Sequence, residues 1–136
     1  TISKNRDLPR TSLRAKIHKA TVTQADVNYV GSITIDKPLL KKVDLWPYEK
    51  VLVVSNTSGH RLETYVIEGP EDSGVICMNG AAAHLIKAGE EIIIMAFESS
   101  TKPIEPTAIL VDKSNRFVEY LSEQSQTLPD PVEMLI

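Results

Sequence analysis

The chain has 136 residues, with 15 Lys and Arg against 18 Asp and Glu, a net charge of -3, three His, a single Cys and 42% hydrophobic residues. These values predict one globular domain over residues 1–136, and the scattered basic residues argue against nucleic acid, which needs a concentrated positive surface. A lone Cys cannot form an intrachain disulfide, and no apolar stretch approaches the roughly eighteen residues of a membrane-spanning helix, so we expect a cytoplasmic protein without a membrane segment.

The N-terminal quarter of the chain predicts a loose lead-in followed by two strands. Residues 1–12 are polar and lack an apolar period. Over residues 13–18 apolar and polar side chains alternate, which is typical of a half-buried strand with two cations and an imidazole on one face. Residues 27–35 are rich in β-branched and aromatic side chains and predict a second strand, in which Gly31 indicates a bulge or a close backbone approach.

The next part of the chain predicts a helix and a hairpin. Asp36 and Pro38 are signals for the start of a short helix over residues 38–43. Two strands follow, over residues 51–54 and 60–67, and the residues between them have turn chemistry.

The remaining elements are short. We expect a strand over residues 75–78, a small-residue helical segment over 81–86, the most hydrophobic strand over 92–97 and a further strand over 107–111. The tail, residues 121–136, has little pattern and is expected to end loosely.

A weak internal repeat, called the internal echo below, indicates the architecture. Residues 38–54 and 80–95 both read as a short helix, a tight turn with Glu and a four-residue apolar strand. Two such units in a mainly β chain suggest a small pseudo-symmetric β-barrel with short helices over residues 13–120, because closure removes the exposed edges of short strands. A two-sheet sandwich is the alternative.

Metal and nucleotide chemistry have no sequence support. His18, His60 and His84 lack the spacing of a metal site, and the single Cys adds little. Glycine-rich phosphate-binding motifs do not occur. We therefore expect no metal.

The dipeptide Gly31-Ser32 is informative through its surroundings. Alone, it predicts only a bulge followed by a strand serine. Four segments accompany it in order: residues 12–36, 59–67, 76–85 and 89–97. Together they resemble the pyruvoyl-dependent aspartate 1-decarboxylases, which make β-alanine for pantothenate, and the resemblance runs from Leu13 to about Asp112. It implies a double-psi β-barrel.

The resemblance implies that the chain is made as a proenzyme that cuts itself between Gly31 and Ser32. The Ser32 hydroxyl would attack the Gly31 carbonyl, the resulting ester would eliminate, and the dehydroalanine would hydrolyse to a pyruvoyl group, the cofactor. Glycine suits this step because it tolerates a strained backbone. Thr64 matches the family's residue near this step and its substrate pocket.

The resemblance also implies how L-aspartate is handled. The ketone condenses with the aspartate amine and accepts the electron pair released as CO₂ leaves. Tyr65 would deliver a proton to the α-carbon, and Lys16 and Arg61 would bind the carboxylates. Strand alternation places Arg61 on the same face as Tyr65 but Thr64 on the opposite face, so one pocket for both requires a twist or a bulge.

Further positions match the family's pocket. The substrate-contact segment comprises Asn79, Gly80, Ala81 and Ala82. The alternative interpretation of this segment is the start of a helix whose small residues serve packing. His18 and Tyr29 match second-rank pocket positions, where packing is also the alternative. The chain departs from many members at Val54-Ser55, where they carry Trp-Asn.

Family members are homotetramers with pockets between neighbouring subunits, and the same assembly is expected here. The sequence leaves open whether cleavage is spontaneous or needs a maturation helper protein. Two other functions also stay open: an unprocessed barrel homologue that serves as a binding or assembly module, and a decarboxylase of another amino acid.

Overall fold

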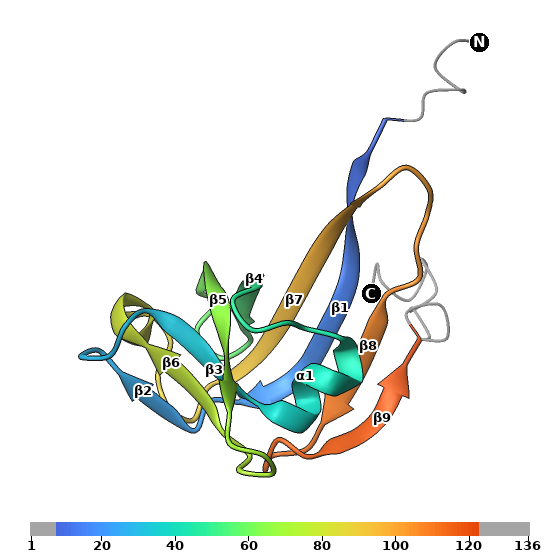
Figure 1. The fold of residues 1–136 in the computed structure, drawn as a ribbon. Coiled ribbons are helices and arrows are strands. Elements are labelled where there is room, and N and C mark those ends of the chain that lie inside the picture. Colours follow the sequence, from blue (N-terminus) through green and yellow to red (C-terminus); the bar gives the residue numbers. More distant parts are fainter. Residues whose placement is uncertain (1–7, 123–136) are drawn as a thin grey trace, which may run out of the picture.

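The computed structural model describes residues 8–122, most of which lie in strands (Figure 1). The strands are β1 (Arg10–Thr21), β2 (Gln24–Asp26), β3 (Ser32–Asp36), β4 (Lys50–Ser55), β5 (Arg61–Gly69), β6 (Ile76–Asn79), β7 (Glu91–Ser100), β8 (Thr107–Val111) and β9 (Phe117–Leu121). The helices are α1 (Lys37–Val43) and the short 3-10 helix η2 (Gly80–His84). Within the described residues, no helix has the length and apolar character needed to cross a membrane.

The strands form a small barrel. Their order in the sheet is β2-β6-β3-β5-β4-β7-β1-β8-β9. Only residues 22 and 23 separate β1 from β2, and the Thr23 amide already donates to the carbonyl oxygen of Ile76 on β6 at 2.8 Å. Strand β2, at one end of this order, therefore continues β1, which lies between β7 and β8 toward the other end; this link closes the sheet and confirms the mainly β barrel.

The internal echo corresponds to a local two-fold relation. The two segments fold as α1 with β4 and as η2 with β7, and β4 and β7 pair antiparallel. Val53 and Ile94 are the third residues of the two apolar runs, and they lie directly opposite each other. The parallel pairs β3 with β5 and β2 with β6 correspond to each other in the same way, because β3 precedes α1 as β6 precedes η2.

The core is built from β-branched side chains that alternate along the strands. Ile17, Ile33, Ile94 and Val53 are fully buried inside the barrel. Burial of each such side chain stabilises the fold by about 1.5–3 kcal/mol. Figure 1 shows α1 between β3 and β8, and its Leu39, Leu40 and Val43 are buried there.

The predicted strand over residues 27–35 is wrong in its first half. The Asp26 carboxylate accepts a hydrogen bond from the Asn28 amide at 2.9 Å, and the Asp26 carbonyl oxygen accepts one from the Tyr29 amide at 3.4 Å. This Asx-type turn overrides the strand propensity of the segment. Gly31 consequently ends a loop, and Ser32 begins β3.

The lead-in and the helical segment also differ from expectation. Strand β1 begins at Arg10 and not at Leu13, because β7 extends to Ser100 and pairs with residues 10–12. The helical segment is a 3-10 turn over Gly80–His84, and β9 was not predicted. Residues 1–7 of the lead-in and 123–136 of the tail lie outside the described residues.

Candidate functional site

Ser32 lies at the junction between a loop and a strand, with its hydroxyl held in a fixed direction. Its side chain is 1% exposed, and Ser32 lies opposite Asn79 in the antiparallel pair of β3 and β6. The Asn79 amide nitrogen Nδ2 donates to Ser32 Oγ at 2.8 Å, and the Ser32 hydroxyl donates to the Val30 carbonyl oxygen at 3.3 Å. Ser32 Oγ thus has one donor that can stabilise negative charge and one acceptor for its proton.

Gly80 supports the backbone in front of Ser32. Its φ is +70°, a left-handed conformation that favours glycine. A Cβ at this position would lie 2.6 Å from Gly31 Cα and 2.9 Å from the Tyr29 carbonyl oxygen. Only glycine allows this close approach, so Gly80 and Gly31 form a matched contact at the predicted cleavage site.

An open hollow of about 430 Å³ lies beside this contact. It is lined by Gly31, Leu62, Glu63, Thr64, Tyr65, Asn79, Ala81, Ala82 and Leu85. Of the expected site residues, it therefore brings together Gly31, Thr64, Tyr65, Asn79, Ala81 and Ala82, whereas Ser32 and Gly80 do not line it.

Thr64 and Tyr65 both reach the hollow without a bulge in β5. Residues 61–65 pair with β4, whereas β5 pairs with β3 only from Val66 to Gly69, and neither register is interrupted. In the part of the chain that the structure describes, the first half of β5 therefore presents an open edge. Side chains from both faces of a strand can reach a hollow that lies along its edge. The described registers of β5 contain no bulge, so a bulge is not what brings Thr64 and Tyr65 to one hollow.

The two predicted cations do not line the hollow. Arg61 is exposed at the start of β5. Lys16 on β1 lies opposite Met95 of β7, and β4 stands between β7 and β5. Three strand spacings thus separate Lys16 from β5, which is about 14 Å along the sheet. The second-rank residues His18 and Tyr29 also lie outside the lining, with Tyr29 57% exposed in the loop before Gly31.

A buried carboxylate that sequence reasoning missed joins the two walls of the hollow. Glu90 is 8% exposed; Oε1 accepts from the Ser55 hydroxyl at 2.6 Å and Oε2 accepts from the Lys87 amide at 2.6 Å. Ser55 Oγ in turn accepts from the amides of Thr57 and Ser58. Glu90 therefore ties the β4–β5 turn to the segment after η2. The signal in the sequence was Ser55, which together with Val54 replaces the Trp-Asn pair of many family members.

We expect Glu90 to make the fold acid-sensitive. Burial by itself raises the pKa of Glu90, but hydrogen bonds from Ser55, Lys87 and Ser58 and the charge of His60 together outweigh it, so the pKa lies below its ordinary value. A lowered pKa in the folded state gives stability that is present above the unfolded-state pKa and is lost as the pH falls through the folded-state pKa. Wild-type unfolding free energy should therefore fall from about pH 5 downward more steeply than that of Glu90→Gln.

The measurement is urea unfolding of both proteins across this pH range. Glu71→Gln, at an exposed loop position, is the control and should follow the wild-type curve. Parallel curves for wild type and Glu90→Gln would show that Glu90 carries no such stability.

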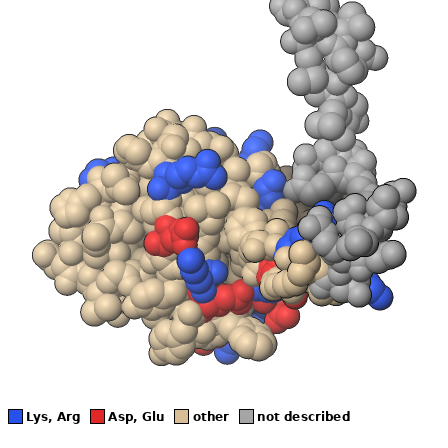
Figure 2. Space-filling view, turned by 90° about the horizontal axis from the view of Figure 1, so that it is seen from above, with Lys and Arg blue, Asp and Glu red and all other residues tan. Residues whose placement is uncertain are grey.

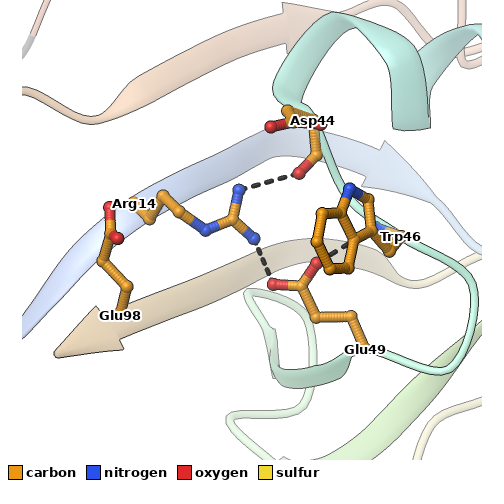
Figure 3. A pocket seen from close by; sticks show the side chains of 5 residues that line it. All are labelled: Arg14, Asp44, Trp46, Glu49 and Glu98. Atoms are coloured by element: carbon orange, nitrogen blue, oxygen red, sulfur yellow. Dashed lines mark hydrogen bonds and ion pairs between the residues drawn. The ribbon is translucent and has the colours of Figure 1, made fainter.

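A second hollow, of about 420 Å³, is lined by Arg14, Asp44, Trp46, Glu49 and Glu98 (Figure 3). The Arg14 guanidinium donates to the Asp44 carbonyl oxygen at 2.7 Å and pairs with the Glu49 carboxylate, which also accepts from the Trp46 amide at 3.0 Å. The cation is thus already neutralised and fixes the loop after α1. This hollow contains none of the predicted site residues.

Charge elsewhere is mixed. On the face seen in Figure 2, basic and acidic side chains are interspersed. Among residues 8–122, no group of three or more His, Cys, Asp or Glu side chains could hold a metal ion.

The chain is similar to known proteins over most of its length. The model of the aspartate decarboxylase family matches residues 8–118. An aspartate 1-decarboxylase of Neisseria meningitidis serogroup C is 49% identical over 117 residues, which cover 83% of this chain and 92% of that protein. One of Clostridium botulinum strain Alaska E43 is 53% identical over 111 residues, covering 79% and 90%. One of Bacillus cytotoxicus is 51% identical over 120 residues, covering 85% and 94%.

Proposed function

The chain belongs to the aspartate decarboxylase family, and from that premise we propose that it cuts itself between Gly31 and Ser32 and then converts L-aspartate to β-alanine and CO₂ in the cytoplasm, for pantothenate synthesis. The observation that carries the proposal is the buried Ser32 hydroxyl, which accepts from Asn79 Nδ2 at 2.8 Å beside an open hollow. The test is incubation of the purified protein with aspartate, and with glutamate in a parallel sample, while CO₂ release is followed. Aspartate alone should be consumed at a substantial rate.

The cleavage follows from the two partners of Ser32. Oγ attacks the Gly31 carbonyl carbon, the peptide C–N bond breaks, and the hydroxyl proton moves to the Ser32 nitrogen. During this shift the negative charge develops on the Gly31 carbonyl oxygen. Oγ itself becomes negative in the next step, as an oxygen of the leaving carboxylate, and there the Asn79 amide stabilises it. The ester then loses the Ser32 α-proton and breaks at the Cβ–O bond, which leaves a Gly31 carboxylate and dehydroalanine. Water converts the dehydroalanine to a ketone and releases ammonia.

The residues around position 32 fit a pyruvoyl group. The Asn79 amide is a buried donor beside this position, and Gly80 leaves no side chain between it and the backbone of residue 31. Ala81 and Ala82 line the hollow with small side chains, which leaves space next to this position. The ketone supplies the electron sink for loss of the carboxylate. Tyr65 lies in the same hollow and delivers the proton to the α-carbon, and Thr64 adds a hydroxyl for processing and substrate contact.

Aspartate has two carboxylates and requires two fixed cations. Arg61 begins the strand that lines the hollow, whereas Lys16 lies three strands away, about 14 Å along the sheet within one chain, and does not line the hollow. We therefore assign Lys16 to a hollow of a neighbouring subunit in a homotetramer. Exposed apolar side chains beside the cleavage site support this assembly, because Tyr29 is 57% and Val30 72% exposed. Analytical ultracentrifugation should give a tetramer, and a stable monomer would contradict the assignment.

Gly80→Ala should slow cleavage and destabilise the protein. The new Cβ would lie 2.6 Å from Gly31 Cα, so the loop that carries the scissile bond must shift. Gly59→Ala is the matched control, because Gly59 has a similar φ of +79° but a Cβ added there would meet nothing within 4 Å. Both variants should lose about 1–2 kcal/mol through φ, but only Gly80→Ala should cleave more slowly in a time course followed by mass spectrometry. Equal cleavage rates for the two variants would remove Gly80 from this role.

A further inference from the structure

Cys77 belongs to a square of four side chains on one face of the β3–β6 pair. Thr34 lies opposite Cys77 and Ser32 lies opposite Asn79, so the four residues are neighbours along and across the two strands. The Cys77 thiol, which is 7% exposed, donates to Asn79 Oδ1 at 3.0 Å. Asn79 Nδ2 donates to Ser32 Oγ at 2.8 Å and to Thr34 Oγ1 at 2.9 Å.

We propose that Cys77 is a positioning residue for self-cleavage, whose S–H group fixes the Asn79 amide so that its nitrogen, and not its oxygen, faces Ser32. This inference rests on the proposed cleavage at Gly31-Ser32. The hydroxyls of Ser32 and Thr34 can each donate or accept, so neither selects an orientation of the amide. A thiol is a weak acceptor but can donate, so among these neighbours it favours the amide oxygen on its own side.

The thiol stays in its donating form. Burial, followed by the charge of Asp26, raises the pKa of the Cys77 thiol above its ordinary value, so the S–H proton is retained at neutral pH. The reversed amide would place Oδ1 against Ser32 Oγ. That orientation opposes the negative charge that Oγ acquires when it leaves as a carboxylate oxygen during ester elimination, whereas the observed orientation stabilises it.

The first test compares Cys77→Ala with Cys77→Ser in a cleavage time course of freshly made protein, followed by intact mass. Cys77→Ala should cleave about three- to tenfold more slowly than wild type, the range expected for one neutral hydrogen bond. Cys77→Ser keeps a donor and should cleave within about twofold of wild type. Met78→Leu is the control for packing, because Met78 is the fully buried neighbour in β6 and this exchange nearly conserves volume.

The second test reads the hydrogen bond itself. Cys77 is the only cysteine, so the Raman S–H stretching band reports on one group. In the uncut Ser32→Ala protein, the additional change Asn79→Leu should move this band to higher frequency, because the acceptor is lost. An unmoved band, wild-type cleavage by Cys77→Ala, or equally slow cleavage by Cys77→Ser would each overturn the inference. A wild-type chain that never cleaves would instead refute the proposed function, while the Raman result would stand separately.

Discussion

Ser32→Ala should leave the chain in one piece and abolish decarboxylation, while the fold persists. The hydroxyl is the nucleophile, and without it neither the ester nor the ketone can form. The substitution removes the Ser32 hydrogen bonds with Asn79 and Val30, but Asn79 Nδ2 keeps Thr34 Oγ1 as an acceptor at 2.9 Å. The cost in unfolding free energy should therefore be about 1–3 kcal/mol, which a folded domain tolerates.

Three measurements check this prediction: intact mass after long incubation, CO₂ release from aspartate, and a thermal melt. Ser73→Ala is the control, because it too removes a hydrogen-bonded serine hydroxyl, one that accepts from the Val75 amide in an exposed loop. It should cleave and turn over like wild type. Aspartate decarboxylation by the uncut Ser32→Ala protein would contradict the mechanism.

Tyr65→Phe should separate cleavage from turnover. The phenol lies in the hollow beside Gly31 and Asn79, and its ring packs near Tyr48 with centroids 6.4 Å apart. Phe keeps the ring and removes only the hydroxyl. Processing should therefore proceed normally, whereas kcat on fully cleaved protein should fall by about 10² to 10⁴-fold, the usual contribution of a positioned proton donor.

Tyr48→Phe is the matched control, since Tyr48 is 77% exposed and does not line the hollow. It should keep wild-type kcat. Full turnover by Tyr65→Phe would remove Tyr65 from proton delivery, and a failure of that variant to cleave would assign Tyr65 to processing instead.

The parts of the fold that sequence reasoning predicted are those set by local pattern. The strands over residues 51–54 and 92–97 follow directly from apolar runs. The helix begins after Asp36 with Pro38 in its first turn, although the Asp36 carboxylate makes no capping hydrogen bond and accepts from the Gly74 amide instead. The similarity of residues 38–54 to residues 80–95 predicted a pseudo-symmetric barrel, and in the structure the equivalent residues Val53 and Ile94 lie opposite each other.

The predictions that failed concern segments where local signals compete, or contacts between residues that are far apart in the sequence. Residues 27–30 have strand-like composition, but the Asp26 side chain makes a turn there, which one hydrogen bond decides. Thr64 and Tyr65 share a hollow because β3 pairs only with the second half of β5 and leaves one edge of the first half open, which is a matter of sheet topology. The contacts of Glu90 with Ser55 and of Asn79 with Ser32 join residues far apart in the chain, so periodicity carries no sign of them.

The central claim is that the chain makes its own ketone by breaking the Gly31–Ser32 bond. Intact-mass and N-terminal analysis of purified wild-type protein tests it most directly. The account predicts fragments of residues 1–31 and 32–136, the second blocked at its N-terminus by a group that borohydride reduces. A single full-length species that nevertheless decarboxylates aspartate at full rate would contradict it.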